Sequence, residues 1–455
     1  MTMKRGTLLL LAMLASAAAA RSAPARASDA TRSASPNSSP ALRLERGQGV
    51  EVSPPASAAS PRERTAAFDP EAATRAYLAS VPPDARARSD AYYEGGYWLL
   101  LWDFLAGAAL SLLLLGTRFS VRMRDLAARI SRRKPIQTAL YWTQYLVVTS
   151  IVLFPLTVWE GYFREHAYGL SNQTFGAWLG DQAKGFLVGL VFGGFAVVVL
   201  YGVLRKTPRT WWLWGSLTAV AILVMGALIA PVYIAPLFNK YKKLEDPKVR
   251  DPILALARAN GIGVRDVYEF DASRQSKRMS ANVSGFLGTE RISMNDNLLN
   301  RGSVPEIEAV MGHEMGHYVL NHVYKGILEI GLLIVIGFAL VRLAFDRIRA
   351  AMEPHWRVES IGDVAGLPLL VLLISAYFFL LTPVLNTVIR TQEAEADIFG
   401  INASQQPDGM AQAALHLAEY RKLDPGKLEE IVFFDHPSGR NRILMAMRWK
   451  AEHLK

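Results

Sequence analysis

Residues 306–322 read EIEAVMGHEMGHYVLNH, a stretch with the apolar spacing of a helix and a cluster of histidines. His313 and His317 are four residues apart, so one helical face presents both imidazoles. Glu314 follows the first histidine and lies near the same site. Two imidazoles at this spacing typically hold one Zn²⁺, and the adjacent carboxylate acts as the general base of a hydrolytic reaction. The stretch therefore predicts a zinc site with one ion per chain.

The same helix contains Gly312 and Gly316, each of which costs about 1 kcal/mol relative to alanine in a helix. The close approach of a partner segment or of a substrate would explain why two glycines are kept. The alternative is a helix with two ordinary surface histidines. His322, five residues after His317, is expected to lie off the ligand face and to be interfacial or structural.

A third ligand is expected from residues 390–400, which read RTQEAEADIFG, because catalytic zinc sites normally have three protein ligands. Glu393 and Asp397 are four residues apart and share a helical face, whereas Glu395 points away from it. The pair is expected to supply one ligand and one acceptor for a ring N–H of a ligand histidine. The alternative for such an acidic cluster is a solvated helix face.

Six long apolar runs indicate a membrane protein, since a helix needs about 20 apolar residues to cross a bilayer. Of the 455 residues, 51% are hydrophobic, and the net charge is +10. The first run contains Asp103, a carboxylate that is expected to line a cavity. The predicted spans are residues 97–116, 138–159, 185–204, 211–232, 326–345 and 364–385.

The rest of the chain divides into polar or leader-like segments. Residues 1–20 have the layout of a signal peptide, with an uncleaved anchor as the alternative, and residues 21–66 have a disordered composition. Between the fourth and fifth spans, residues 251–260 are typical of a helix and residues 291–294 of a strand. The expected order after residue 66 is a membrane region with four spans (67–238), a catalytic region (239–325), a membrane hairpin (326–385) and C-terminal catalytic helices (386–455).

Two absences in the sequence exclude other classes of site. There are no cysteines, so disulfides and thiolate metal sites are excluded, and the metal must use histidine or carboxylate ligands. No aromatic and basic recognition motif accompanies the positive charge, so no nucleic-acid partner is expected. The expected partners are the lipid bilayer and a peptide or protein substrate.

One further histidine, His436, stands in DHPSGRNRILMAM, residues 435–447, just before a predicted final helix. A histidine and an arginine at this place can stabilise the oxyanion of a tetrahedral intermediate.

HEMGHYVLNH, RTQEAEAD, DHPSGRNR and PVYIAPLFNKYKKL together resemble the type I CAAX prenyl endopeptidases, integral-membrane zinc proteases of the gluzincin type. The resemblance runs from about residue 97 to residue 450. It implies a mostly helical polytopic fold, with a ring of seven helices around an intramembrane chamber. It also implies a small α+β region like that of thermolysin at one end of the chamber.

Carried onto this sequence, the resemblance gives each motif residue a role. It implies that Asn282 lies beside a substrate-pairing edge strand, although the run SANVSG is shorter than is usual in the family. The other implied roles are zinc ligands (His313, His317 and Glu393), general base (Glu314), carboxylate behind a ligand histidine (Asp397), oxyanion donor (His436) and motif arginine (Arg442).

The charge pattern predicts on which side of the membrane the site lies. The loops 117–137, 205–210 and 346–363 hold 13 Lys and Arg residues on one side, whereas loop 160–184 on the other side holds two. Because Lys and Arg are enriched on the cytoplasmic side, the site is expected on the periplasmic side of a bacterial inner membrane. Arg86 and Arg88, which precede the first span on the same side as the site, argue against a periplasmic site.

The sequence therefore favours a zinc-dependent metalloendopeptidase that cleaves a membrane-associated or C-terminally modified peptide, with CAAX-type proteolysis implied by the resemblance. One alternative is a membrane quality-control or peptide-binding factor with slow hydrolysis. A zinc transporter is a weaker alternative, because it would need ionisable pairs within several spans, and Asp103 is the main candidate. The sequence does not determine the oligomeric state.

Overall fold

The computed structural model describes residues 68–284, 290–416 and 419–453 of the chain. The predicted signal peptide (1–20) and the predicted disordered segment (21–66) lie outside the described residues. The described residues from 70 onward belong to one compact unit. Six helical segments of this unit are long and apolar enough to cross a membrane, and each contains one of the predicted spans. The resemblance implied seven membrane helices, whereas the described residues contain six candidates.

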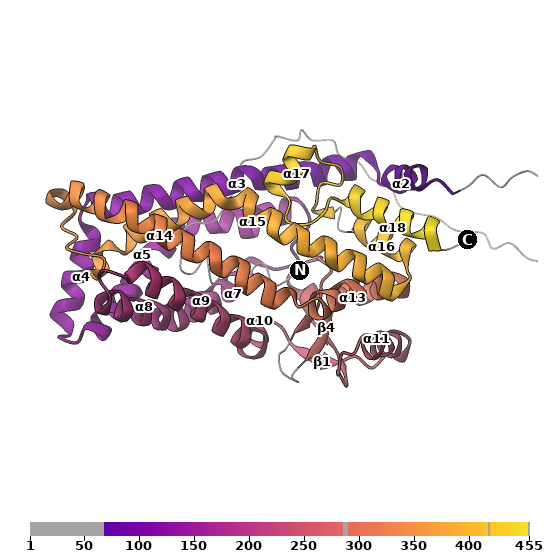
Figure 1. Ribbon diagram of the computed structural model, residues 1–455, viewed down its shortest axis with the longest axis horizontal. Helices are drawn as coiled ribbons and strands as arrows, with labels where there is room; N and C mark the ends of the chain where they lie inside the picture. The colour runs from indigo at the N-terminus through magenta and orange to yellow at the C-terminus, as the bar shows by residue number, and fades with distance from the viewer. Residues whose placement is uncertain (1–67, 285–289, 417–418, 454–455) are drawn as a thin grey trace, which may run out of the picture. The chain divides into compact units, whose positions relative to one another are not determined.

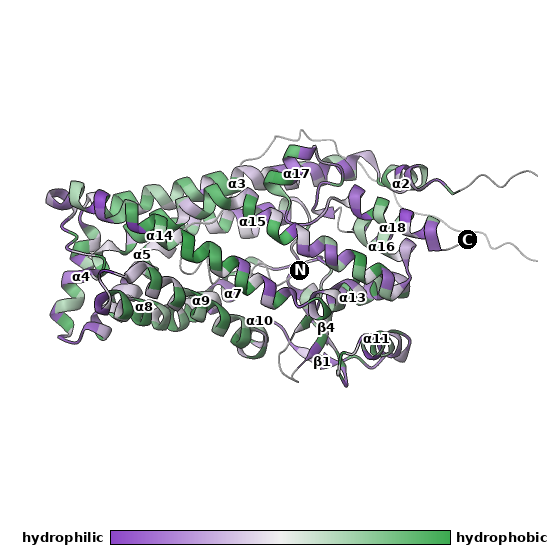
Figure 2. Cartoon of the chain, viewed as in Figure 1, coloured by the Kyte–Doolittle hydropathy of each residue, from purple (hydrophilic) through white to green (hydrophobic). Residues whose placement is uncertain are grey.

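The membrane helices pack in a closed ring, which confirms the predicted helical architecture. Around the ring, α3 packs on α15, α15 on α14, α14 on α9, α9 on α8 and α8 on α5, while α4 bridges α5 and α3. Figure 1 shows the long helices α3, α14 and α15 running side by side with α4 across their end, and Figure 2 shows many hydrophobic residues along the long helices. Their bounds are α3 Pro83–Gly116, α4 Phe119–Ile130, α5 Lys134–Val158, α8 Gly194–Lys206, α9 Trp211–Ile229, α14 His322–Trp356 and α15 Leu367–Ser404.

One end of the ring is filled by a hydrophobic core beneath α4. Large side chains of several helices are fully buried there, including Tyr141, Tyr201, Trp211 and Phe345. The Ser120 hydroxyl of α4 bonds the Tyr141 hydroxyl at 2.6 Å and donates to the carbonyl oxygen of Ala365 at 2.7 Å. Buried aromatic packing and these bonds hold α4 across the end of the ring.

The opposite end carries a small mixed sheet. Its strands are β1 Tyr241–Lys243, β2 Val267–Phe270, β3 Ala281–Ser284 and β4 Arg291–Asn295, in the order β1-β2-β4-β3. Strand β4 is parallel to β2 and antiparallel to β3. The strand predicted at residues 291–294 is therefore confirmed, and the helix predicted at 251–260 corresponds to α11, Pro247–Ala259, which begins earlier and ends one residue sooner.

Two membrane helices, α14 and α15, extend without interruption to the site, whereas α13 is a separate helix. Helix α13, Val304–Val319, packs on α15 and α16, and α16 packs on α18. Both expected hairpin boundaries, before residue 326 and after residue 385, fall inside uninterrupted helices, α14 and α15. The remaining segments are α2 Pro70–Ala79, α6 Glu165–Ala167, α7 Phe175–Val188, α10 Ala235–Phe238, α12 Asp296–Arg301, α16 Pro407–His416, α17 Lys427–Phe433 and α18 Gly439–His453, with π-helical turns at Trp159–Arg164, Gly189–Gly193 and Ala230–Ile234.

Candidate metal centre

Helix α13 presents the histidine pair because its start and its inner face are both well defined. The side chain of Glu306 accepts the backbone N–H of Ser303 in a capping box, and a proline stands in the first turn. Met311 and Met315 are fully buried in the hydrophobic core that α13 shares with the sheet. This packing turns the ligand face of the helix toward α15.

The backbones of α15 and α13 are in direct contact, which explains the two glycines of the histidine helix. A Cβ added at Gly312 would stand 2.7 Å from the carbonyl oxygen of Gly400, and one added at Gly400 would stand 2.6 Å from the backbone nitrogen of His313. A Cβ at Gly316 would stand 3.1 Å from Cα of Ala396. The close partner is therefore α15, and this contact places Glu393 and Asp397 beside His313.

Three side chains converge on one point. His313 Nε2 lies 3.2 Å from His317 Nε2 and 3.3 Å from Glu393 Oε2. His317 Nε2 lies 3.8 Å from Glu393 Oε1. One nitrogen or oxygen atom from each of the three residues lies within 4.8 Å of the other two, an arrangement that can hold a metal ion.

The remaining atoms of these residues show why the donor set fits a metal ion. His313 Nδ1 lies 2.7 Å from Asp397 Oδ1, and His317 Nδ1 lies 2.9 Å from His322 Nδ1, so both Nε2 atoms are left to face the centre. Among the described residues, the buried Oε2 atom of Glu393 accepts no well-formed hydrogen bond. His436 Nε2 lies 2.9 Å from this oxygen, and the two Nε2 atoms of His313 and His317 point to the same place as the carboxylate. Two imidazole nitrogens and a buried carboxylate that converge in this way form a donor set that suits a cation.

Asp397 is held from behind by Arg442 of α18. The Arg442 guanidinium bonds the same Asp397 oxygen that His313 contacts, and all three side chains are buried. Arg442 therefore reaches the histidine through Asp397. The arginine and the carboxylate, which the sequence placed 45 residues apart, form one ion pair behind the first ligand.

His436 lies in the loop between α17 and α18, within reach of Glu393. Its Nε2 atom is 2.9 Å from Glu393 Oε2, and its Nδ1 atom is 3.0 Å from Asp435 Oδ1. Arg390 of α15 donates to the carbonyl oxygens of Glu430 and Phe434, which fixes this loop at the end of α17. Both neighbours of the imidazole are carboxylates, so a hydrogen bond at either contact needs the N–H of that ring nitrogen.

Sequence reasoning missed a second group of site residues. His322 is buried, contacts His317, and has its Nε2 atom 3.0 Å from Glu395 Oε2, which Lys325 also contacts at 2.6 Å. His322 is not one of the three converging residues, as expected, but it contacts His317 at Nδ1, because α13 ends before it and Asn321 turns the chain with φ 58°. The run Leu320-Asn321-His322 was the available signal, since Asn tolerates this left-handed conformation.

Comparison with known proteins identifies the family. "Peptidase family M48" matches residues 243–450, and "CAAX prenyl protease N-terminal, five membrane helices" matches residues 71–240. The uncharacterized metalloprotease YhfN of Bacillus subtilis is 33% identical over 310 residues, which are 68% of this chain and 72% of that protein. The chain belongs to peptidase family M48.

Further relatives of this M48 peptidase include eukaryotic proteins. The CAAX prenyl protease 1 homolog of rice is 27% identical over 278 residues, 60% of this chain and 64% of that protein. CAAX prenyl protease 1 of Saccharomyces cerevisiae is 31% identical over 179 residues, 39% of each chain. The crystal structure of S. mikatae Ste24p is 20% identical and has a TM-score of 0.68, covering 83% of this chain and 95% of that one. The likeness to this crystal structure establishes the shared fold. The match to the family and the six membrane helices together show that the M48 peptidase is a membrane-embedded metalloprotease.

The two ligand-face histidines of the M48 peptidase differ in protonation when no metal is bound. Burial lowers the pKa of the His313 imidazole, but Asp397 and Glu393 raise it more strongly, to about 9. Burial and the neighbouring His313 lower the pKa of His317 to about 3. At neutral pH the metal-free centre therefore holds a proton on His313, which an arriving metal ion must displace.

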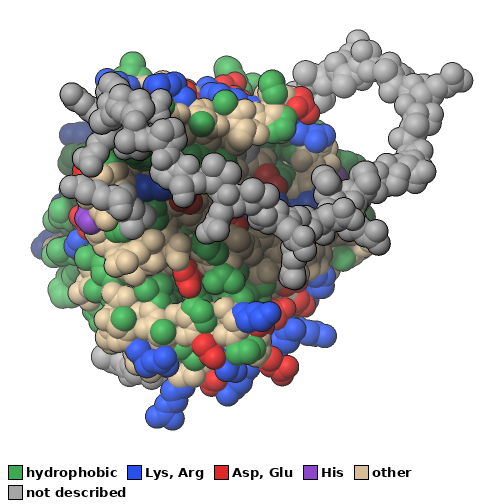
Figure 3. Space-filling model, turned by 90° about the vertical axis from the view of Figure 1, so that its right-hand side faces the viewer, with side chains coloured by type: hydrophobic (Ala, Val, Ile, Leu, Met, Phe, Trp, Pro, Cys, Tyr) green, Lys and Arg blue, Asp and Glu red, His purple; other side chains and the backbone are tan. Residues whose placement is uncertain are grey.

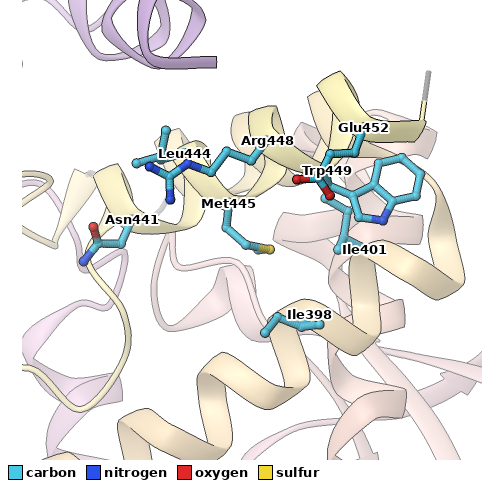
Figure 4. Close-up of a pocket in the computed structure, with 8 residues that line it drawn as sticks. All are labelled: Ile398, Ile401, Asn441, Leu444, Met445, Arg448, Trp449 and Glu452. Atoms are coloured by element: carbon cyan, nitrogen blue, oxygen red, sulfur yellow. The ribbon is translucent and has the colours of Figure 1, made fainter. Parts of the chain in front are cut away.

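Two other features of the M48 peptidase are an asparagine on the edge strand and a pocket. Asn282 is half-buried in β3, the strand at the edge of the sheet, and pairs with Ser293 of β4. Figure 4 shows a pocket of about 430 Å³ between α15 and α18, which none of the metal-centre residues lines. Its lining is Ile398, Ile401, Asn441, Leu444, Met445, Arg448, Trp449 and Glu452.

Proposed function

We propose that the metal of this M48 peptidase is zinc and that the enzyme cleaves peptides presented at the membrane. The observation that carries the proposal is the spacing of the three converging atoms. Two ligands of a tetrahedral zinc ion, each about 2.0–2.1 Å from the metal, stand about 3.3 Å apart. The His313–His317 and His313–Glu393 separations of 3.2 and 3.3 Å match this value, and the His317–Glu393 separation of 3.8 Å is about half an ångström longer.

His313, His317 and Glu393 would hold the ion, which supplies Lewis acidity and makes a water easier to deprotonate. Glu314 stands next to His313 on α13, and its charge is felt by Arg442. Its carboxylate takes the proton of the attacking water and returns it to the leaving amine. His436 donates from Nε2 to the oxyanion that develops on the scissile carbonyl. Asp397 and Arg442 keep the His313 ring in place.

Strand β3 supports an extended peptide as substrate. As the edge of the sheet, it can add a substrate strand through main-chain hydrogen bonds, and Asn282 stands on it as a candidate substrate contact. Because α15, which carries Glu393, is one uninterrupted helix with its membrane span, we propose membrane-associated or C-terminally modified peptides as substrates. CAAX-type processing, named for the relatives in rice and yeast, is one such reaction.

Removal of the metal should abolish hydrolysis. Purified enzyme should cleave a generic fluorogenic peptide, lose the activity on treatment with a chelator, and recover it when about one equivalent of Zn²⁺ is restored. Elemental analysis before and after dialysis gives the metal content. Chelator-resistant cleavage, or folded protein that binds no zinc, would contradict the proposal.

We further propose that the metal centre faces the periplasm of a bacterial cell. Helix α4, at the end of the ring away from the site (Figure 1), exposes an apolar stripe of Phe119, Leu126 and Ile130. The exposed residues Arg122, Arg129, Arg132, Arg133 and Lys134 accompany it, and none has a carboxylate within ion-pair distance in the described part of the chain. Such a helix suits the anionic surface of the cytoplasmic leaflet.

The opposite end shows no such excess of positive charge. In Figure 3 that end faces the viewer, and acidic and basic side chains are interspersed along its lower rim. Two arginines before the first span count against this orientation: Arg86, which lies 4.0 Å from Asp90 and 3.8 Å from Asp424, and the exposed Arg88. They are two residues against the five exposed Lys and Arg residues named at α4.

A reporter fused after Lys455 tests this orientation. A fluorescent protein that matures only in the cytoplasm should stay dark, whereas alkaline phosphatase, which needs an oxidising compartment, should be active. The same reporters inserted in loop 205–210 should give the opposite pattern. Bright fluorescence from the C-terminal fusion would place the site in the cytoplasm.

A further inference from the structure

Each ligand histidine is followed by a series of contacting side chains, and both series end in a carboxylate and then a cation. Behind His313 stands a carboxylate, Asp397, and behind the carboxylate a cation, Arg442. Behind His317 stand an imidazole, His322, then a carboxylate, Glu395, and then a cation, Lys325. The second series has the same order of carboxylate and cation, with one imidazole inserted before them, and its outer two side chains are half-exposed whereas Asp397 and Arg442 are buried.

Geometry explains the insertion. Glu393 and Asp397 share the face of α15 that meets α13, and Glu395, two residues from each, projects from another side of the helix. Its carboxylate is half-exposed, and the buried ring of His322 spans the gap to His317. The left-handed residue Asn321 places His322 there at the first position of α14, because the turn it makes separates α14 from α13.

The hydrogen-bond directions along this chain are mutually consistent. If His317 directs the lone pair of Nε2 to the metal, its proton lies on Nδ1, 2.9 Å from His322 Nδ1. His322 then accepts at Nδ1 and carries its own proton on Nε2, 3.0 Å from Glu395 Oε2. Glu395 accepts from His322 and from the Lys325 ammonium on the same oxygen. Each donor in the chain meets one acceptor.

We propose that His322, Glu395 and Lys325 form a relay that fixes the metal-binding tautomer and ring orientation of His317. His322 and Glu395 are positioning residues, because they act on the metal through His317. The proposal rests on the proposed metal centre, and it predicts that the relay sets metal affinity rather than the fold. Loss of a partner of this kind typically weakens metal binding by about 10–100-fold.

The test is competition of the full-length enzyme against a chromophoric chelator for Zn²⁺, with Co²⁺ absorption spectra of the same proteins. His322→Ala should weaken Zn²⁺ binding by about 10–100-fold and shift the Co²⁺ bands. His322→Asn should recover part of the affinity, because its amide oxygen can occupy the place of Nδ1. The Zn²⁺ affinity of Glu395→Gln should lie between those of wild type and His322→Ala, because glutamine keeps a hydrogen-bond acceptor and loses the negative charge.

His355→Ala, on the exposed far end of the same helix, is the matched control and should leave affinity and spectrum unchanged. Melting of the metal-free proteins distinguishes positioning from folding. A Zn²⁺ affinity in His322→Ala equal to that of wild type would overturn the relay. The relay would also be overturned if His322→Ala and His322→Asn lost the same amount of Zn²⁺ affinity and both melted at lower temperatures without metal. If the wild-type enzyme itself binds no metal, the proposed function fails. If the wild-type enzyme binds Zn²⁺ and the variants bind it with the same affinity, only the relay fails.

Discussion

Replacement of Glu314 by glutamine should reduce peptide hydrolysis by about 10²–10⁴-fold while the protein keeps its metal, because general acid–base catalysis contributes about that factor. Glutamine has nearly the size of glutamate but cannot take a proton from water. His313, His317 and Glu393 are untouched, so the metal content should stay at one ion per chain. Initial rates with a fluorogenic peptide and elemental analysis of the same preparation measure the two quantities.

Glu308→Gln is the matched control for this experiment. Glu308 lies on the same helix, and its carboxylate accepts from the Gln406 amide at 2.8 Å, apart from the metal centre. This variant should keep its rate within about twofold, since side-chain changes away from the reacting groups are mostly small in effect. Full activity in Glu314→Gln would show that another group is the base, and loss of metal would show that Glu314 has a structural role. Comparing the peptide fragments released in cells by wild type and by Glu314→Gln would then identify natural substrates.

Gly400→Ala should separate the two helices that build the centre. The new methyl carbon would stand 2.6 Å from the backbone nitrogen of His313 and 2.8 Å from its Cα, and neither helix backbone can move aside locally. Overpacking of this kind typically destabilises a protein by about 1–3 kcal/mol. The shift should also move Glu393 and Asp397 away from His313, so metal affinity should fall together with stability. Denaturant unfolding in detergent and metal titration measure the two effects.

Gly326→Ala provides the control for the change of residue type. Gly326 lies within α14, and a Cβ there would meet no described atom within 4 Å. Alanine is favoured over glycine in a helix by about 1 kcal/mol, so this variant should be as stable as wild type or slightly more stable. Equal stability and equal metal affinity in Gly400→Ala and Gly326→Ala would show that the contact between α13 and α15 is not needed at its present distance.

The local parts of the site could be predicted from the sequence because they depend only on the helical period. His313 and His317 share a face at any packing, and Glu393 and Asp397 likewise share a face. The six membrane helices depend on the length and hydrophobicity of single runs, and all six appear within the described residues. The ring of helices came from the resemblance, and the packing order of the helices confirms it.

The sequence by itself determined which residues can meet the metal, and it raised the question of why the histidine helix contains glycines. Helical spacing treats Glu393 and Asp397 alike, and the resemblance assigned the first to the metal and the second to a ligand histidine. The tertiary structure shows Glu393 facing both Nε2 atoms and Asp397 at Nδ1 of His313. The structure likewise identified α15 as the close partner and brought His322 and Glu395 to the second histidine. These contacts depend on one turn at Asn321 and on packing between segments about 80 residues apart, and no local periodicity reports either of them.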